Sequence, residues 1–334
     1  MAWLVTGGAG YIGSHVVRAF RAAGIDVVVF DDLSTGRKEF VPEGVPFVQG
    51  SVTSPVDLER AFSSATIDGV VHLAGFKYAG VSVHRPLECY AANVEGVRLL
   101  LETCERHGVL RFVFSSSAAV FGTPDVDLVD EDTATAPQSP YGESKLIGEW
   151  LCRDVARARA VQGLAPLQWT ALRYFNVVGS GDASVFDVSP HNLFPLVLAA
   201  ITQGRSPKIF GTDYPTPDGT CVRDYIHVAD VASAHVVAAQ KLEAGEPLAH
   251  TFNLGRGEGL SVQQIMDAVA GVTGIAFTPE LAPRRPGDPA RIVTSSAKAN
   301  AELGWYAVHD LEAMVDSAWS AWQFAARTGA ATLG

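Results

Sequence analysis

Cysteine, basic residues and long apolar runs are all scarce in this sequence of 334 residues. Its four cysteines, Cys89, Cys104, Cys152 and Cys221, are far apart without a Cys-x-x-Cys pair. This spacing indicates buried free thiols and argues against a zinc site or a disulfide framework. Lys and Arg number 25 against 36 Asp and Glu, a net charge of −11, so we expect no nucleic-acid partner.

Membrane insertion and secretion are not expected either. The richest apolar run, residues 193–201, is short and contains a proline, whereas a spanning helix needs about 20 apolar residues. The first residues lead directly into a predicted strand, without a basic segment followed by a long apolar stretch. We therefore expect a cytoplasmic protein with no membrane partner.

Short apolar segments alternate with helical ones through the first half of the chain. Apolar, largely β-branched runs occur at residues 2–5, 27–30, 47–48, 70–73, 112–114 and 169–172. Between the first two runs, apolar residues recur with helical spacing from Ile12 to Ala23, and Gly24 follows where a helix would end. Strands that are almost wholly apolar and alternate with helices are typical of a parallel sheet covered on both faces. We predict an α/β fold with a doubly wound parallel sheet of Rossmann type.

The second half of the chain is less regular and predicts a second, smaller α+β domain. Prolines and glycines interrupt it repeatedly, but residues 225–241 have the spacing of a helix that could pack back on the sheet. The predicted first domain is 1–173 with about 222–241 added, and the second is 174–221 and 242–334. Residues 122–140, rich in Asp, Thr and Pro, predict a functional or mobile loop.

A glycine-rich turn, Thr6-Gly7-Gly8-Ala9-Gly10-Tyr11-Ile12-Gly13, follows the first predicted strand. Such a turn needs glycine because its backbone adopts positive φ and approaches a pyrophosphate closely, and the helix that follows offers free N–H groups. Asp31 and Asp32 close the second strand, where a carboxylate can accept hydrogen bonds from ribose hydroxyls. Two carboxylates would repel a 2′-phosphate, so the pattern favours NAD, and nearby Arg37 and Lys38 leave NADP as the alternative.

A second pattern joins a tyrosine, a lysine and a serine. Tyr141 and Lys145 are four residues apart, which places both on one face of a helix. A lysine ammonium and a positive nicotinamide would both lower the pKa of the phenol from about 10, so that it could act as a base near pH 7. Ser115 to Ser117 end a predicted strand at the sheet edge where ligands bind, and Ser117 could hydrogen-bond the reacting oxygen.

Together these motifs resemble the extended short-chain dehydrogenase/reductase family, and within it the UDP-glucose 4-epimerases. The resemblance runs from Leu4 to about Trp305 and is carried by residues 6–13, 72–77, 115–122, 140–145, 173–176, 210–215 and 222–228. In that family a tightly held NAD takes hydride from C4 of the sugar while the tyrosine takes the O4 proton. The 4-keto sugar then rotates, and hydride returns to its other face. The resemblance thus implies an enzyme that interconverts UDP-glucose and UDP-galactose.

The resemblance also implies roles for individual residues. The catalytic residues are Ser117, Tyr141 and Lys145. The implied cofactor contacts are Gly7, Gly10, Tyr11, Ile12, Gly13, Asp31, Asp32, Ser34, Ser51, Val52, Leu73, Ala74, Gly75, Lys77, Asn93, Ser115, Tyr141, Lys145 and Phe175. The implied substrate contacts are Ser117, Tyr141, Asn176, Asn192, Leu193, Phe210, Arg223, Tyr225, Arg285, Asp288 and Ile292. Arg223 and Arg285 would clamp the diphosphate, a role that suits the planar guanidinium, and Asp288 would hold the uridine ribose.

The residues after Ser117 separate two reactions that related enzymes perform. The sugar-nucleotide dehydratases resembled here carry an Asp-Glu pair directly after the Ser/Thr, whereas this chain has Ala118 and Ala119. Without a carboxylate to remove a proton from C5, the keto intermediate has few options beyond taking its hydride back. The sequence therefore favours epimerisation, unless Asp125 or Asp127 supplies a carboxylate.

Two further departures bear on specificity. Ser51 stands where the family usually has an Asp that receives the adenine amino group. Ile292 lies at the position whose bulk gates N-acetylated sugars, so 4-epimerisation of UDP-N-acetylglucosamine or UDP-glucuronate stays an alternative. A non-catalytic NAD-sensing protein is a remote alternative.

Assembly and metal binding complete the expectations. The family resemblance implies a homodimer formed through a helix pair that includes Val94–His107 and the helix after Tyr141. The histidines show no metal-ligand spacing, so no metal is predicted, and His72 is expected to be a core histidine.

Overall fold

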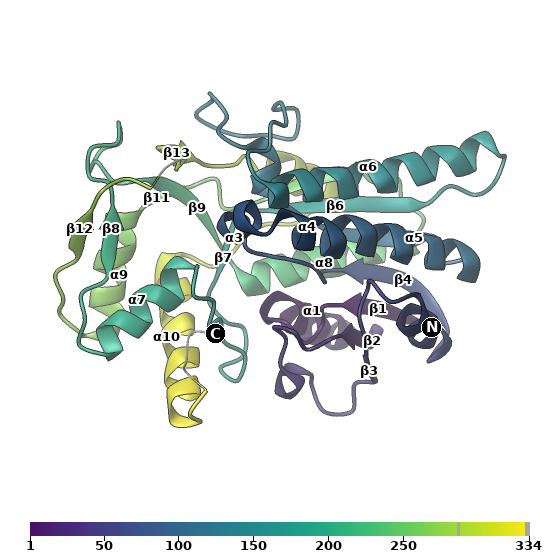
Figure 1. The fold of residues 1–334 in the computed structure, drawn as a ribbon, viewed down its shortest axis with the longest axis horizontal. Helices are drawn as coiled ribbons and strands as arrows, with labels where there is room; N and C mark the ends of the chain where they lie inside the picture. Colours follow the sequence, from purple (N-terminus) through teal and green to yellow (C-terminus); the bar gives the residue numbers. More distant parts are fainter. Residues whose placement is uncertain (286–287, 331–334) are drawn as a thin grey trace.

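The computed structural model describes residues 1–285 and 288–330. Its main element is a seven-stranded parallel sheet in the order β10-β6-β5-β4-β1-β2-β3 (Figure 1). The strands are β1 (Ala2–Thr6), β2 (Asp26–Asp31), β3 (Phe47–Gln49), β4 (Ile67–His72), β5 (Arg111–Ser117), β6 (Gln168–Tyr174) and β10 (Thr251–Leu254). The strand order reverses between β1 and β4, and ligands bind at this switch point in open α/β sheets. The predicted Rossmann-type α/β fold is confirmed.

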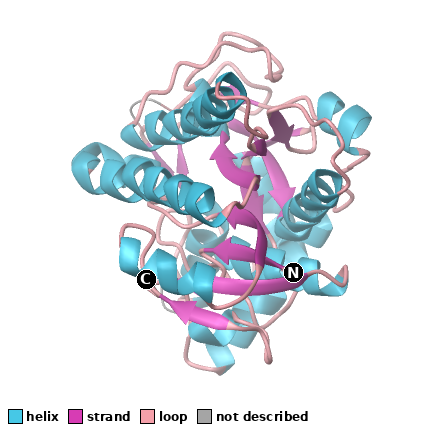
Figure 2. Cartoon of the chain, turned by 90° about the vertical axis from the view of Figure 1, so that its right-hand side faces the viewer, coloured by secondary structure: helices cyan, strands magenta, loops and turns pink. Residues whose placement is uncertain are grey.

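Helices cover both faces of this sheet (Figure 2). They are α1 (Tyr11–Ala22) and α8 (Val228–Glu243) on one face, and α2 (Pro55–Ser63), α5 (Gly96–His107) and α6 (Pro140–Val161) on the other. Two short helices, α3 (Ala79–His84) and α4 (Pro86–Tyr90), and a π turn at Ala91–Glu95 lead into α5. Trp3 and Phe20 anchor the core on the α1 side, and Phe112 and Phe114 anchor the core on the α6 side. These two apolar layers fix the positions of the strand ends, and therefore also the positions of the polar residues that follow the strands.

The second half forms a smaller unit beside the carboxyl ends of the strands (Figure 1). Its central strand, β9 (Val222–His227), pairs with β7 (Asn176–Val178), β11 (Gly259–Ser261) and β13 (Arg291–Ile292). A separate pair consists of β8 (Lys208–Phe210) and β12 (Glu280–Ala282). The helices α7 (Leu193–Thr202), α9 (Val262–Thr273) and α10 (Leu311–Arg327) share an apolar core that includes Phe194, Met266 and Trp322.

The structure differs from the sequence-based domain division at two places. Residues 225–227 are strand rather than helix, because the His227 ring accepts a hydrogen bond from Ala229 N (3.0 Å) and caps α8 at its first turn. Strand β10 pairs with β6, so residues 251–254 belong to the large sheet and not to the second unit. The rest of the predicted helix forms α8, which packs against α1, β5 and β6. Residues 286–287 and 331–334, all in the predicted second domain, lie outside the described residues.

Residues 122–139 contain neither helix nor strand, as expected, but side chains and backbone fasten them to the rest of the chain. Val129 is fully buried, its N–H donates to Val293 O (2.8 Å) and its carbonyl accepts from Ser295 N (2.7 Å). Glu131 accepts a hydrogen bond from Asn253 N at 2.7 Å. The loop is therefore anchored on both the large sheet and the second unit.

Other expectations concern membranes, cysteines and His72. None of the described helices combines the length and hydropathy needed to span a bilayer. All four cysteines are buried free thiols, as predicted. His72 is buried, and its Nδ1 lies 2.7 Å from the Thr6 hydroxyl, which confirms it as a core histidine.

Candidate active site

A cavity of about 1150 Å³ runs along the carboxyl ends of the parallel strands and into the second unit. Residues of the glycine turn line one end, and Arg223, Tyr225 and Arg285 line the other. Tyr141, Lys145, Ser115 and Ser117 lie among its lining residues as well. The cavity thus joins the predicted cofactor, catalytic and substrate residues in one space.

Close packing against neighbouring backbone requires glycine at two positions of the glycine turn. Gly7 has φ +72°, and a Cβ there would lie 2.7 Å from Ala74 N. A Cβ at Gly13 would lie 2.1 Å from the Gly7 carbonyl oxygen. Gly10 begins α1 without a side-chain hydrogen bond to the free N–H groups of the first turn. A helix N-terminus of this kind favours an anion such as the pyrophosphate of a dinucleotide.

Asp31 ends β2 beside this turn and is held in a fixed orientation. Its two carboxylate oxygens accept hydrogen bonds from Ala9 N (3.0 Å) and Leu33 N (2.8 Å). Burial raises the pKa of Asp31, and these two N–H donors oppose that effect. Asp32 instead accepts from the Ser34 N–H and hydroxyl. Both carboxylates line the cavity, where ribose hydroxyls could share the remaining lone pairs.

Arg37 and Lys38, the two cations that left NADP as an alternative cofactor, contact aromatic rings. Arg37 lies over the rings of Phe40 and Phe186, at 5.8 and 5.1 Å from the centroids. The Lys38 ammonium lies 3.2 Å from the centroid of Phe47. Neither side chain is therefore directed at a 2′-phosphate, and the acidic pair keeps its preference for NAD.

Most of the other predicted cofactor contacts lie in the cavity, but Asn93 does not. Leu73, Ala74, Gly75 and Lys77 follow β4 and line the cavity, as do Ser51 and Val52 after β3 and Phe175 after β6. The buried Asn93 amide accepts from Phe76 N (2.6 Å) and donates to Phe76 O (3.1 Å) and the Ser144 hydroxyl (2.9 Å). Asn93 therefore holds the loop after β4 against α6, because all of its amide groups are occupied by protein partners.

Ser51, which stands where the family usually has an aspartate, is held in its turn by protein contacts. Its N–H donates to Asp57 Oδ2 at 3.1 Å, and its hydroxyl lies 2.8 Å from the Thr53 hydroxyl. Asp57 thus supplies a carboxylate that orders the turn, while Ser51 keeps its place in the cavity wall. We retain the adenine contact of Ser51 as a prediction.

The catalytic candidates meet where β5 ends and α6 begins. Ser139 caps α6 by accepting from Gly142 N (3.2 Å), and Pro140 occupies the first turn, so Tyr141 is held at the start of the helix. Lys145 follows one turn later, and its ammonium donates to Ser115 O at 2.8 Å. That ammonium lies 5.8 Å from the centroid of the Tyr141 ring. The helix spacing therefore brings the two groups together as predicted.

Burial acts on the proton affinities of both groups. It raises the pKa of the Tyr141 phenol, and a hydrogen bond with Ser117 opposes this effect. It lowers the pKa of Lys145 to about 8, so the ammonium form still dominates at pH 7. Burial of the phenol thus opposes the lowering of its pKa that is expected from the Lys145 ammonium together with a positive nicotinamide.

The substrate end of the cavity gathers groups from distant segments. Asn176, Asn192, Leu193, Phe210, Arg223, Tyr225 and Arg285 all line it. The Arg285 guanidinium lies over the Phe210 ring at 5.0 Å. Asp288 pairs with Arg285 at 2.8 Å and lies 3.7 Å from Arg223, so it holds the two arginines together. It is not among the described lining residues, and its contact with the uridine ribose stays a prediction.

Ile292 lies one layer away from this wall. On β13 it pairs in register with Arg223, and it packs against the cluster of Val120, Phe121, Val129 and Phe175. Its contacts link the anchored loop of residues 122–139 with the cavity. Its predicted role as a gate for the sugar remains a prediction.

Comparison with known proteins identifies the family. Residues 3–255 match the NAD dependent epimerase/dehydratase family. The chain belongs to this family. It is 44% identical over 323 residues to the UDP-glucose 4-epimerase of Corynebacterium glutamicum (96% of this chain, 95% of that protein), and 43% identical over 323 residues to that of Azospirillum brasilense (95% and 90%). A crystal structure of the UDP-glucose 4-epimerase from Stenotrophomonas maltophilia with bound NAD and formylated UDP-arabinopyranose is 37% identical, with a TM-score of 0.91 over 98% of this chain and 99% of that one.

The Asp-Glu pair expected of the dehydratases is replaced in this chain by Ala118 and Ala119. Ala118 and Ala119 form the turn directly after Ser117, whose hydroxyl accepts from Ala119 N at 3.2 Å. Asp125 and Asp127 are exposed on the loop of residues 122–139 and are not among the described residues of the cavity wall. They therefore do not replace the missing acid and base.

One acidic residue of this family member was not found by the sequence argument. Asp187 lines the cavity, accepts hydrogen bonds from Asn192 Nδ2 (2.7 Å) and Ser189 N (2.9 Å), and has its pKa raised by burial. Its charge also contributes to the raised pKa of Tyr11, after burial. Asp187 belongs to an irregular segment without periodicity, so only its proximity to Asn192 could have drawn attention to it.

Proposed function

We propose that this chain interconverts UDP-glucose and UDP-galactose with bound NAD as its cofactor. The observation that carries the proposal is the meeting of Tyr141, Lys145 and Ser117 in the cavity that also contains the glycine turn and the two arginines. The names of the similar proteins support the choice of sugar nucleotide. The alternatives with other UDP-sugars, or without catalysis, have no comparable support.

The cofactor fits the residues present. The turn at Gly7–Gly13 would take the pyrophosphate, Asp31 and Asp32 a ribose, and Lys145 the second ribose. The need for glycine at positions 7 and 13, where a Cβ would overlap neighbouring backbone, supports this assignment, because a dinucleotide-binding turn packs in this way. When bound, NAD supplies reversible oxidation at C4 of the sugar.

Tyr141 would transfer the proton of the sugar O4 hydroxyl. Burial raises the pKa of the phenol, so nearby positive charge must stabilise its phenolate form for it to act as a base. Lys145 provides such a charge from this chain, and Ser117 would hold the reacting oxygen by a hydrogen bond. After the 4-keto sugar has turned, the same phenol would return the proton to O4.

Anchoring through UDP would leave the hexose free to turn. Arg223 and Arg285 can bind a diphosphate with paired N–H donors, and Asp288 orients both guanidinium groups. Asn176 and Asn192 also line the cavity and would contact the substrate. Because these groups hold the nucleotide rather than the sugar ring, either face of C4 can be presented to the cofactor.

A homodimer in the cytoplasm is part of the proposal. Helices α5 and α6 pack together, and α6 carries Trp150 with an exposed side chain. A four-helix contact between two copies would cover this tryptophan. Sedimentation of the purified protein should give a dimer, and Trp150→Glu should give a monomer; a wild-type monomer would contradict this part of the proposal.

The decisive experiment measures UDP-glucose formed from UDP-galactose, and compares UDP-N-acetylgalactosamine as substrate. Tyr141→Phe should reduce turnover by about 10²- to 10⁴-fold, which is the usual contribution of general acid-base catalysis. Tyr306→Phe changes an exposed tyrosine distant from the cavity wall and should leave the rate unchanged. Near-normal turnover by the Tyr141→Phe protein would refute the mechanism.

A further inference from the structure

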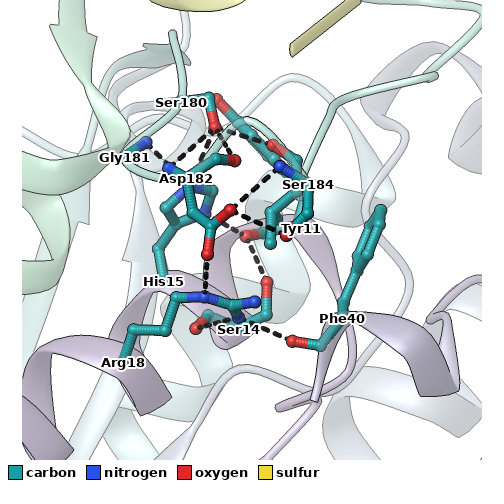
Figure 3. A network of polar contacts seen from close by, with 10 residues as sticks. Tyr11, Ser14, His15, Arg18, Phe40, Ser180, Gly181, Asp182 and Ser184 are labelled. Carbon is teal, nitrogen blue, oxygen red and sulfur yellow. Dashed lines mark hydrogen bonds and ion pairs between the residues drawn. The ribbon is translucent and has the colours of Figure 1, made fainter. Parts of the chain in front are cut away.

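One face of α1 carries three polar side chains that reach across to the second half of the chain (Figure 3). Tyr11, His15 and Arg18 have the i, i+4, i+7 spacing that puts side chains on one side of a helix. The Tyr11 hydroxyl donates to Gly179 O at 2.5 Å. These three residues, the α1 contact face, lie on the same helix whose N-terminus closes the glycine turn.

His15 joins the two sides through both ring nitrogens (Figure 3). Its Nδ1 lies 2.8 Å from Tyr11 O and its Nε2 accepts from Gly181 N at 2.9 Å. An acceptor Nε2 requires the neutral ring with its proton on Nδ1. Burial lowers the pKa of His15 to about 4, so this form persists at neutral pH.

Arg18 connects three segments at once (Figure 3). Its Nε donates to Asp182 Oδ2 (2.8 Å), and its Nη1 donates to Phe40 O (2.6 Å) and Ser14 O (3.3 Å). The other oxygen of Asp182 accepts from the Ser184 N–H and hydroxyl. Burial disfavours the ionised carboxyl, but the bonds from Ser184 and Arg18 outweigh it and lower the pKa of Asp182 to about 2. The ion pair is therefore present throughout the physiological pH range.

Aromatic packing continues this contact toward the cavity. Phe40, whose carbonyl Arg18 holds, packs edge-to-face on Phe186 with centroids 5.1 Å apart. Phe40 follows the loop that bears Ser34, and Phe186 precedes Asp187. Ser34 and Asp187 both line the cavity. The contact between α1 and residues 179–187 thus holds together two segments that supply cavity-lining residues, one with Ser34 and one with Asp187.

We propose that the α1 contact face retains bound NAD by holding residues 179–187 against the helix that carries the glycine turn, with Arg18 as the principal positioning residue. The inference rests on the proposed function for its choice of cofactor. A dinucleotide held between the segments that bear Ser34 and Asp187 dissociates faster when these two segments can separate. Loss of the contact therefore accelerates NAD release while leaving the catalytic groups at the end of β5 unaltered.

The test measures release of radiolabelled NAD from the loaded protein into an excess of unlabelled NAD, without sugar. Arg18→Met keeps much of the side-chain length but removes the charge-assisted bonds, and it should raise the release rate about five- to tenfold. Asp182→Asn removes the charge from the opposite side, without a change in α1, and should have a similar effect. With saturating NAD, turnover of UDP-galactose by either variant should stay within about twofold of wild type.

The control is Arg21→Met, one turn further along α1, where Arg21 donates to Glu43 O on the surface. It should release NAD at the wild-type rate. The double variant of Arg18→Met and Asp182→Asn should release NAD no faster than the more affected single variant, because both remove the same contact. Wild-type release rates in both single variants, or equal acceleration by Arg21→Met, would overturn the proposal. Because the assay contains no sugar, a chain that fails to epimerise UDP-galactose would refute the proposed function while the release rates still decide this role.

Discussion

The cofactor end and the substrate end of the cavity are held in place by different interactions. At the cofactor end, the residues follow β1, β2, β4 and β5, neighbours in one hydrogen-bonded sheet with an apolar layer on each face. At the substrate end, Asn192, Arg223 and Arg285 come from segments far apart in the chain, and a few carboxylates connect them. Side chains at the cofactor end thus take their positions from the sheet, whereas those at the substrate end depend on individual polar contacts.

A buried ion pair beneath the catalytic helix illustrates the first kind of support. Arg173 on β6 donates to both oxygens of Glu149 on α6, at 2.8 and 2.6 Å, and the Ser116 hydroxyl donates to the same carboxylate at 2.5 Å. The two side chains are 6% and 5% exposed. Glu149 lies one turn after Lys145 and two turns after Tyr141. The pair therefore fixes the register of the catalytic face of α6 against the ends of β5 and β6.

The largest effect is expected from Arg173→Met. Removing one partner of a buried pair leaves an uncompensated charge, here on Glu149, and should lower the free energy of unfolding by about 3–5 kcal/mol. Arg153→Met, on the same helix, breaks a surface pair with Asp154 and should cost at most about 1 kcal/mol. Urea denaturation of both variants checks the contrast. Equal losses of unfolding free energy in the two variants would show that the cofactor end is no more dependent on its buried ion pair than on a surface pair.

The second-largest effect is expected at Asp224, which supports the substrate end. Its carboxylate accepts from Arg256 N (2.9 Å), Gly257 N (3.0 Å) and Thr294 N (3.2 Å). Asp224→Asn turns an NH₂ group toward N–H donors, so we expect a loss of about 2 kcal/mol in the free energy of unfolding. Because these bonds position β13 beside Arg223, KM for UDP-galactose should rise more than kcat falls.

Steady-state kinetics and urea denaturation together test the Asp224 prediction. Asp213→Asn is the control, since Asp213 is largely exposed and pairs with Arg284 on the surface. It should alter neither quantity appreciably. A fall in kcat with unchanged KM in the Asp224→Asn protein would contradict a role limited to the substrate end.

The same contrast explains how much of the molecule the sequence can predict. Gly7, Gly13 and Asp31 are predictable because their chemistry depends on neighbours along one strand-turn-helix unit, and Tyr141 with Lys145 because helix spacing is local. The family assigned by resemblance is the one that the comparisons identify. The geometry of the catalytic pair follows from this local order.

Other features depend on contacts between distant residues and could not be predicted. Asp187 enters the cavity from an irregular segment near the middle of the sequence, and its neighbour Tyr11 lies near the start of the sequence. Strand β10 has four residues, a length at which an apolar run does not distinguish strand from helix. The raised pKa of Tyr141 required knowledge of its burial, which outweighs the hydrogen bond with Ser117. Tertiary burial, rather than local pattern, decides each of these.

A smaller, pH-dependent effect on stability is expected at His227, which lies where β9 ends and α8 begins. Burial lowers the pKa of His227 to about 3, with charge on His309 and His15 adding to the shift. Since this value lies below the 6.5 of an unfolded histidine, the unfolded chain binds more protons between pH 3 and 6.5. The stability contributed by neutral His227 is thus complete above pH 6.5 and is lost as the pH falls toward 3. His15, His72 and His235, with pKa values lowered by burial to about 4, 3 and 4, act in the same direction.

His227→Asn keeps an acceptor to cap α8 but removes this titration. Between pH 6.5 and 4.5 the variant should lose about 1–2 kcal/mol less stability than wild type. Asp224 has the opposite sign, because burial raises its pKa to about 6 and the folded chain then holds the extra proton. His84→Asn replaces an exposed histidine and serves as control. Parallel stability curves for the His227→Asn protein and wild type would contradict the prediction.

The smallest effect on stability, together with a clear effect on binding, is expected from Arg285→Met. The Arg285 side chain is 56% exposed and pairs with Asp288, so its loss should change the free energy of unfolding by less than about 1 kcal/mol. Its place in the cavity wall predicts a rise of about tenfold in KM for UDP-galactose, which corresponds to about 1.4 kcal/mol of binding. The adjacent Arg284 pairs with Asp213 and packs over Tyr214 at 4.1 Å, so Arg284→Met should leave KM unchanged. If both variants raised KM equally, the overall positive charge of the region, rather than the directed Arg285 guanidinium, would hold the diphosphate. The substrate end would then depend less on individual contacts than the hydrogen bonds of Asp224 and the ion pairs of Asp288 indicate.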